Sequence, residues 1–315
     1  MGNIFELPME REQDGTSVKV PASGNFFVAD NKQEEQDEQE EQDEQGYDRT
    51  WNPRVLNQEP DTDTGGSVLF TSHHIVLPPS SASVRAHMNS WPIFDQGDIG
   101  SCAANAIAGA IEFELRTKDE SHRDAPSRLF IYYNERATIG EGVDGDSGVQ
   151  IKDGDSGVQI KDVLFALRTT GVLSETSWPY VTDHLNWAPP ESCYKSAVHV
   201  TSEFRLFPQG LLEIKKAIAS GYPVVFGIQV YSSFFKMEHQ KSGSIPMPDT
   251  SSETLHGGHA ILAVAYDDTS QRVTFRNTWG AEWGDGGCGT LPYEYFDQDR
   301  SLANSMWVIK KMDQF

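Results

Sequence analysis

Cysteine is scarce in this sequence. Its 315 residues include three, Cys102, Cys193 and Cys288, and no two of them form a Cys-x-x-Cys pair. An odd number without such a pair excludes a disulfide framework and a zinc site with four cysteine ligands. We therefore expect a cytoplasmic or other reducing compartment, and we predict no metal site.

Long apolar runs and basic side chains are also lacking. No segment approaches the ~20 consecutive apolar residues that span a bilayer, and the opening MGNIFELPMEREQ has neither the basic nor the apolar region of a signal peptide. Only 25 Lys and Arg stand against 47 Asp and Glu, which gives a net charge of -22. Such a field repels nucleic acid and acidic membrane surfaces, so neither is expected as a partner.

The acidic charge is concentrated near the amino terminus. Residues 1–65 carry 17 acidic and five basic side chains, and residues 31–46 repeat the block EEQDEQ without one apolar side chain. Because such a block cannot bury enough apolar surface to offset the entropy of ordering, we expect it to be disordered. We divide the chain into an acidic tail and arm, residues 1–79, and a folded domain, residues 80–315. Both a solvated leader without activity and a regulatory or docking tail are open.

From residue 80 the pattern becomes that of a globular domain. Apolar residues at helical spacing predict helices over 102–116, 126–138, 156–170 and 210–221. β-branched and aromatic residues between turn signals predict strands over 224–231, 259–266, 272–276 and 306–310. Helices first and strands later are typical of an α+β protein with two segregated halves and a site in the cleft between them.

A perfect tandem repeat, DGDSGVQIK, fills residues 144–152 and 153–161. In the second copy a capping box, Ser156 with Gln159, leads into an unbroken helical pattern. We therefore expect a helix that begins at Ser156 and a first copy extruded as a loop. The DxDxG string has Gly148 where a calcium loop needs a third oxygen ligand, so a calcium site is not favoured.

Cys102 lies where the first predicted helix begins, after QGDIGS. Free backbone N–H groups and the helix dipole stabilise a thiolate at such a position, although a lone cysteine among alanines is also compatible with a small core residue. His259 enters an apolar strand after a Gly-Gly pair, and Asn277 ends the next strand. A nucleophile needs a base, and the base needs a group that holds its tautomer, so these three residues form a complete set. His256, ahead of the glycine pair, is the less favoured base.

These segments resemble the papain-like cysteine peptidases. The resemblance covers about residues 78–312 and rests on QGDIGSC, SRLFIYYNERA, GYPVVFGI, GGHAILAVAYDD and FRNTWGAEWGDGG. The family's histidine follows its cysteine by roughly 130 to 150 residues. His259 follows Cys102 by 157 residues, and removing one nine-residue repeat copy gives 148. Ile99 and Ala103 replace a cysteine and an aromatic residue of plant and lysosomal members, so the sequence is most similar to the disulfide-poor microbial and viral type.

The resemblance implies a two-lobed α+β fold, with the nucleophile on a helical lobe and the His/Asn pair on an antiparallel β-sheet lobe. It implies that Cys102 is the nucleophile, His259 the general base and acid, and Asn277 the group that orients the imidazole. Gln96 would then be a donor of the oxyanion hole, together with the Cys102 backbone N–H.

Three further residues are implied on the substrate side of the site. Gly157 is expected to let an extended substrate approach the backbone, with Gly148 in the first repeat copy as its rival. Gly258 precedes the histidine, and Trp279 is expected to shield the Asn–His hydrogen bond from water.

The implied reaction is hydrolysis of a peptide or isopeptide bond through a thioester acyl-enzyme, with a protein or peptide substrate and no cofactor. A catalytically silent binding protein with the papain fold, and an acyl transferase that uses the same triad, are the alternatives. A monomer is expected, although the sequence leaves the oligomeric state open. Because residues 1–65 show no helical apolar stripe, we expect that this leader does not inhibit the enzyme and that the catalytic side chains are accessible. Occupation of an apolar subsite by the arm at residues 66–80 would contradict this expectation.

Overall fold

The computed structural model divides the chain into two units, residues 1–45 and residues 46–315. The residues that it describes all lie in the second unit and are 56, 58–61, 68–69, 77–88, 90–119, 124–139, 143–144, 148–149, 158–198, 203–206, 210–297 and 299–310. The acidic block at 31–46, for which we predict disorder, lies outside the described residues, and so does Gly157.

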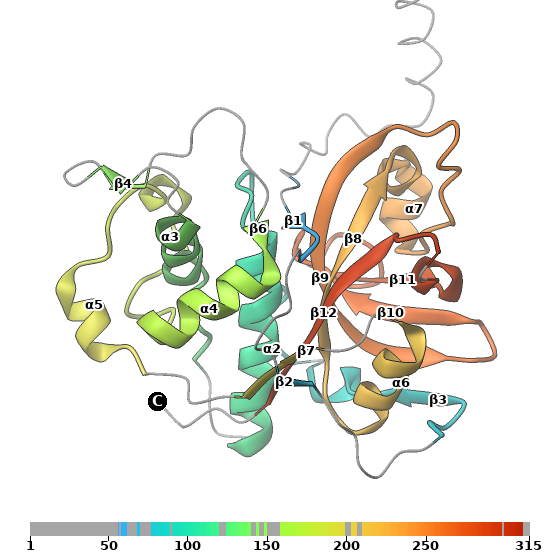
Figure 1. Ribbon diagram of the computed structural model, residues 1–315, viewed down its shortest axis with the longest axis horizontal. Coiled ribbons are helices and arrows are strands. Elements are labelled where there is room, and N and C mark those ends of the chain that lie inside the picture. Colours follow the sequence, from blue (N-terminus) through green and yellow to red (C-terminus); the bar gives the residue numbers. More distant parts are fainter. Residues whose placement is uncertain are drawn as a thin grey trace, which may run out of the picture. The chain divides into compact units, whose positions relative to one another are not determined.

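Helices dominate the first half of the described domain and strands the second (Figure 1). The α-helices are α2 (Cys102–Lys118), α3 (Arg128–Ile139), α4 (Ile160–Thr170), α5 (Glu191–Ser196), α6 (Leu211–Ala219) and α7 (Met237–Ser242). Short 3-10 helices are η1 (Arg85–Met88), η2 (Thr182–His184), η3 (Ser232–Phe235) and η4 (Tyr293–Phe296). The strands are β1 (Gln58–Glu59), β2 (Val68–Leu69), β3 (Ser81–Ser83), β4 (Val143–Asp144), β5 (Gly148–Val149), β6 (Val158–Gln159), β7 (Glu203–Leu206), β8 (Val224–Tyr231), β9 (Leu255–Asp267), β10 (Arg272–Arg276), β11 (Cys288–Pro292) and β12 (Ala303–Lys310).

Eight of the described strands form one sheet, in the order β11-β10-β9-β8-β12-β7-β2 with β3 paired to β9. Neighbouring strands are antiparallel except for β7 and β2. Alternate side chains of the central strands enter different cores, as the two-residue period of a strand requires. Val225 and Leu262 belong to the cluster formed with α2, α3 and α4, whereas Phe226 and Ile261 belong to the cluster that includes α6. Both faces of the central sheet are therefore covered.

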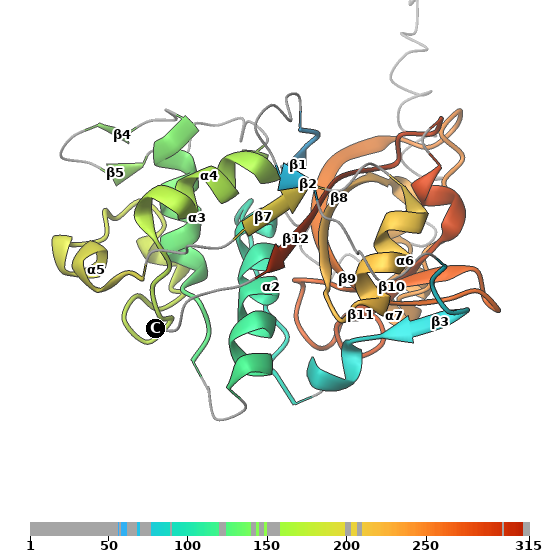
Figure 2. The ribbon, with the colours of Figure 1, turned by 60° about the horizontal axis from the view of Figure 1, so that its bottom comes forward.

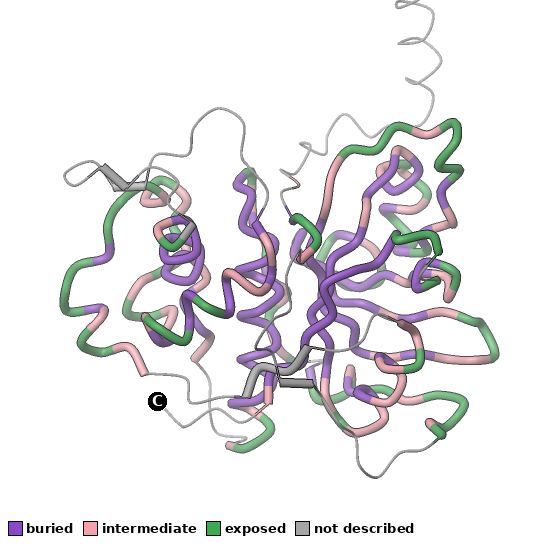
Figure 3. Tube along the Cα trace, in the orientation of Figure 1, coloured by how far each residue is buried: buried purple, intermediate pink, exposed green. Residues whose placement is uncertain are grey.

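Helix α2 joins the two lobes. In Figures 1 and 2 it runs between helices α3, α4 and α5 on one side and the sheet on the other, and Figure 3 shows it buried along most of its length. Every residue from Cys102 to Leu115 is buried, which a helix rich in alanine tolerates because its small side chains allow close approach on all sides. A Cβ added to Gly109 would lie 3.5 Å from Leu262 on β9. The helix that begins with Cys102 thus packs directly on the strand that carries His259.

The predicted fold class is confirmed, and each predicted helix and strand overlaps an observed one. The start predicted for the helix in the repeat is wrong. Helix α4 begins at Ile160, with Gln159 as its N-cap and no side-chain capping bond, because Val158 and Gln159 are extended and pair as β6 with β1. The helix does begin in the second copy, as predicted, while Asp144, Gly148 and Val149 of the first copy belong to the β4–β5 ladder.

No helix among the described residues has the length and apolar character needed to cross a membrane.

Candidate active site

Cys102 is the first residue of α2, as the sequence predicts. Its N-cap is Ser101, whose carbonyl and hydroxyl oxygens both accept a hydrogen bond from Asn105 Nδ2, at 2.8 and 2.9 Å. No acidic residue lies in the first turn of the helix, so the helix dipole at this terminus acts on Cys102 without an opposing carboxylate in the same turn. The side chain is fully buried.

His259 on β9 and Asn277, which follows β10, lie side by side. His259 Nε2 and Asn277 Oδ1 are 2.8 Å apart. Asn277 Oδ1 also accepts a hydrogen bond from the Thr278 backbone N–H at 2.9 Å, and this donor sets which end of the amide faces the imidazole. Since an oxygen faces Nε2, that nitrogen carries the proton. The lone pair of the neutral ring is therefore on Nδ1, which is buried and finds no hydrogen-bond partner among the described residues.

The environment of His259 favours the neutral imidazole. The side chain is completely buried, and burial lowers its pKa to about 4 although the bond to Asn277 acts in the opposite direction. Trp279 lies against the ring, with centroids 4.9 Å apart. Trp279 is itself 2% exposed and contacts Phe234 and Phe235 on η3. These aromatic contacts place Trp279 against the His259 ring, and its shielding of the Asn–His hydrogen bond from water stays a prediction.

Gln96 is tied to the same region by both its backbone and its side chain. Its N–H donates to the Thr278 carbonyl at 2.8 Å, and its Oε1 accepts a hydrogen bond from Thr278 Oγ1 at 2.6 Å. With Oε1 engaged, the donor end of the amide points the other way, and Nε2 donates to the Ile99 carbonyl at 3.1 Å. The amide is thus held as a donor beside the loop that leads into Cys102.

A second polar network supports this loop from the helical lobe. The Tyr180 hydroxyl donates to the Gln96 carbonyl at 2.8 Å and contacts Ser101 Oγ at 2.5 Å. Arg128 lies over the Tyr180 ring at 4.0 Å and binds Glu175 at 2.8 Å. The residues before the nucleophile are therefore anchored from both lobes.

The other histidine and cysteines near the motifs differ from the central set. His256 is exposed on β9, with Nε2 3.0 Å from Ser232 Oγ, so it is not placed like the buried His259. Cys193 and Cys288 are free and buried, and burial raises the pKa of both thiols. Among the described residues no group of three His, Cys, Asp or Glu side chains has the arrangement of a metal site.

A segment that the sequence analysis assigned to the arm lies against the site. We call residues 56 and 58–61 the strap. Strand β1 of the strap pairs in parallel with β6, and a Cβ added to Gly258, next to His259, would lie 1.8 Å from the Gln58 carbonyl oxygen. Gly258 is thus in contact with an extended peptide, one that belongs to this chain.

Three bonds hold the far end of the strap. Trp307 Nε1 donates to Asp61 Oδ2 at 2.7 Å, and the Lys161 N–H in the first turn of α4 donates to Oδ1 at 3.2 Å. The Asp61 N–H donates to Ser305 Oγ at 2.8 Å. Gln96, Cys102 and His259 are all fully buried in this arrangement, so the expectation that they are accessible is wrong for the state described by the structure.

The strap could not be predicted from the sequence because its residues show neither periodicity nor a motif. A signal was nevertheless present in the partner strands. Gly227 and Gly258 lie inside apolar strands, where glycine is unfavourable unless another chain segment approaches closely.

The site can now be compared with known proteins. The family model described as papain family cysteine protease matches residues 78–298. The chain is 34% identical over 227 residues to a peptidase C1-like protein of Acanthamoeba polyphaga mimivirus, and the match covers 69% of each protein. It is also 34% identical to xylellain, a cysteine protease from Xylella fastidiosa, with a TM-score of 0.70 over 84% of this chain and 99% of that one. The procathepsin B S9 of Trypanosoma congolense, 16% identical, shares the fold with a TM-score of 0.62 over 82% of this chain and 86% of that one. This chain belongs to the papain family of cysteine proteases.

Proposed function

We propose that the protein hydrolyses peptide or isopeptide bonds, with Cys102 as nucleophile, His259 as general base and acid, and Asn277 as the group that orients the imidazole. The observation that carries this proposal is the 2.8 Å contact between His259 Nε2 and Asn277 Oδ1, from which the tautomer of His259 is assigned. Because Thr278 holds the amide of Asn277 with its oxygen toward Nε2, the basic lone pair is on Nδ1, the nitrogen left for the thiol.

The proposed reaction forms and then hydrolyses an acyl-enzyme. Cys102 transfers its proton to His259 Nδ1, and its sulfur attacks the substrate carbonyl carbon. The oxygen of the tetrahedral intermediate takes the negative charge and is stabilised by the Cys102 N–H and by Gln96 Nε2. Collapse expels the amine, which receives the proton from His259, and leaves a thioester. Water, deprotonated by His259, then releases the carboxylic acid and restores the thiol.

Two other functions use the same fold. An acyl transferase would replace water with an amine in the second step, and a silent binding protein would take no step at all. The intact set of Cys102, His259, Asn277 and Gln96 favours a working enzyme over a silent one. The buried surroundings of His259 do not distinguish water from an amine, so the product must be analysed.

Covalent labelling tests the proposal. A peptidyl epoxide that alkylates cysteine nucleophiles is incubated with the full chain, with Cys102→Ala and with the matched control Cys193→Ala, and the modified residue is found by mass spectrometry. We expect labelling of the full chain and of Cys193→Ala only, at Cys102. Each protein is also labelled in a second background that carries Asp61→Ala, which removes bonds that hold the strap. This background distinguishes a site covered by the strap from a site that is inactive. Labelling of Cys193 or Cys288 at an equal rate, or none in either background, would contradict the assignment.

Product analysis completes the test. Digestion of a mixed peptide pool in the presence of a small primary amine yields free acids from a hydrolase and amides from a transferase. We expect mainly free acids and no dependence on added cofactor. We also propose a reducing compartment as the working environment, since none of the three described cysteines is in a disulfide bond.

A further inference from the structure

Gly227 marks an opening in the sheet beside the site. It lies in the middle of β8, among buried apolar residues, and does not have the positive φ that would require glycine. Glycine weakens a strand interior through lost side-chain contacts and greater chain entropy. Its role here is therefore to leave room for neighbouring side chains. A Cβ at this position would lie 2.1 Å from Gln58 Oε1 and 2.6 Å from Asn304 Oδ1.

The Gln58 side chain fills that space. It is only 3% exposed, and its Nε2 donates to Asn304 Oδ1 at 3.2 Å and to the neighbouring Glu59 carbonyl. Its Oε1 is buried without a hydrogen-bond partner among the described residues. A long carboxamide side chain thus enters a recess with glycine on one wall and a polar acceptor on another.

The backbone of β12 is distorted where it presents Asn304. The pairing of β12 with β8 shifts register between Asn304 and Trp307, and Ser305 has a φ of 51° although it is not glycine. Bulges re-aim side chains, and residues held in the left-handed region cluster at functional sites. The bulge turns the Asn304 amide toward the strap, while the strained Ser305 binds the Asp61 N–H.

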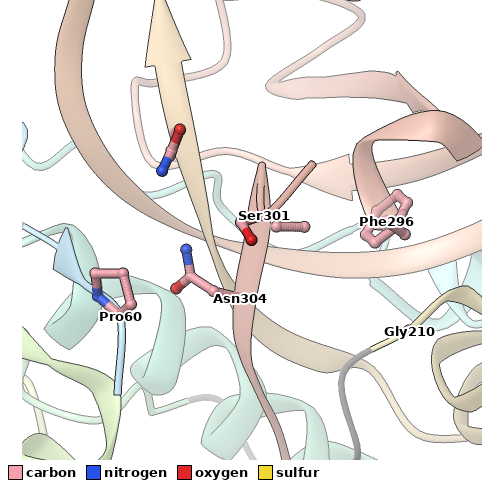
Figure 4. A pocket seen from close by; sticks show the side chains of 7 residues that line it. Pro60, Gly210, Phe296, Ser301 and Asn304 are labelled. Atoms are coloured by element: carbon pink, nitrogen blue, oxygen red, sulfur yellow. The ribbon is translucent and has the colours of Figure 1, made fainter. Parts of the chain in front are cut away.

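The strap occupies this recess in the manner of a bound peptide. Its strand β1 adds to β6 through the main chain, a mode in which backbone bonds supply affinity and pockets for alternate side chains supply specificity. Pro60 lies two residues after Gln58. It lines, with Asn304, Ser301 and Phe296, an adjoining cavity of about 520 Å³ (Figure 4).

We propose that the recess between Gly227 and Asn304 is a specificity pocket for a glutamine side chain of the substrate, and that Gln58 is its intramolecular occupant. This inference rests on the proposed peptidase function and deepens it. A substrate glutamine repeats the bond from Nε2 to Asn304 Oδ1. Leucine fills the same length but leaves that buried acceptor unpaired, an ionised glutamate has no donor for it, and a lysine would bury a charge without a carboxylate to pair with.

The test measures kcat/KM of the full chain for four peptides that differ only at one position, occupied by Gln, Leu, Glu or Lys, in each register around the scissile bond. Leaving one buried acceptor unpaired predicts a preference for Gln over Leu of about tenfold or more in one register. Asn304→Leu should reverse this preference, and Asn304→Asp should shift it toward Lys. A ratio of two substrates does not depend on the fraction of enzyme that is folded, so modest instability of a variant leaves the result interpretable.

Asn134→Leu is the matched control, because Asn134 is a similarly buried carboxamide on α3, where it binds the Phe130 carbonyl and the Tyr194 hydroxyl. The Gln/Leu ratio should be unchanged in this variant. A second measurement uses the strap itself. Gln58→Leu should raise activity on a glutamine-free peptide by loosening the strap, and the double variant Gln58→Leu with Asn304→Leu should lower it again.

The outcomes separate the two proposals. Equal rates or a Leu preference in the full chain, or an Asn304→Leu variant with an unchanged ratio, would overturn the glutamine pocket while leaving the peptidase intact. Absence of hydrolysis of every peptide together with absence of epoxide labelling would remove the proposed function, and the pocket with it.

Discussion

Acidification should destabilise the folded protein through His259. The pKa of this fully buried imidazole is lowered from 6.5 to about 4 by burial. As the pH falls through 6.5 the unfolded chain takes up a proton that the folded chain refuses, so stability that is complete above pH 6.5 is lost progressively down to about pH 4. At ~1.4 kcal/mol per pKa unit, the loss amounts to about 3 kcal/mol.

The assay is urea unfolding of wild type and His259→Gln at about pH 7 and about pH 4.5. The variant lacks the titrating ring, so the difference between its pH dependence and that of wild type isolates His259 and cancels every other group. We expect wild type to lose about 2 to 3 kcal/mol more than the variant on acidification. Parallel pH dependences would refute the reasoning. A wild type that loses less than the variant would show that His259 is held as a cation, paired with a thiolate at Cys102, instead of neutral.

Two further predictions concern residues outside the triad. Asp61→Ala removes charge-assisted bonds to Trp307 Nε1 and the Lys161 N–H, worth about 1.5–3 kcal/mol each. Peptide hydrolysis by the full chain should therefore rise at least tenfold, while the surface control Asp299→Ala leaves it unchanged. Equal rates for Asp61→Ala and wild type would show that the strap does not block the site. Glu135 is fully buried, which raises its pKa to about 8. The free energy of unfolding should therefore fall by about 4 kcal/mol between pH 4.5 and pH 8, because the unfolded chain ionises first. Glu135→Gln should flatten this pH dependence in urea unfolding, and a variant with the wild-type dependence would contradict the burial argument.

Two residues of the candidate site could be located from the sequence because each stands at a boundary between elements. Cys102 opens an alanine-rich helical pattern, and Asn277 ends a β-branched strand, so local periodicity locates both. The pairing that joins Gln96 to Thr278 brings together residues far apart in the chain. No local pattern encodes such a contact, and at Gln96 only the resemblance to a family indicated it.

The start of α4 shows where local reasoning fails. Ser156 and Gln159 form a good capping box in isolation, and the residues between them have no local reason to be extended. Pairing of β6 with β1 nevertheless keeps Val158 and Gln159 extended, so the helix begins only at Ile160. Tertiary contacts override a capping preference worth about 1 kcal/mol, and the partner that does so comes from a segment about a hundred residues away.

The local surroundings of Gly227, Gly258 and Ser305 do indicate that another chain segment lies close to them. Each breaks a rule of its element, since two place glycine inside strands and the third places serine in the left-handed region. Such choices weaken the sheet, and they persist where another requirement outweighs the loss. Here all three meet the strap, through the Gln58 side chain, the Gln58 carbonyl and the Asp61 N–H. A sheet built only for stability would carry side chains at both glycine positions, and those side chains would close the space in which a peptide lies beside His259.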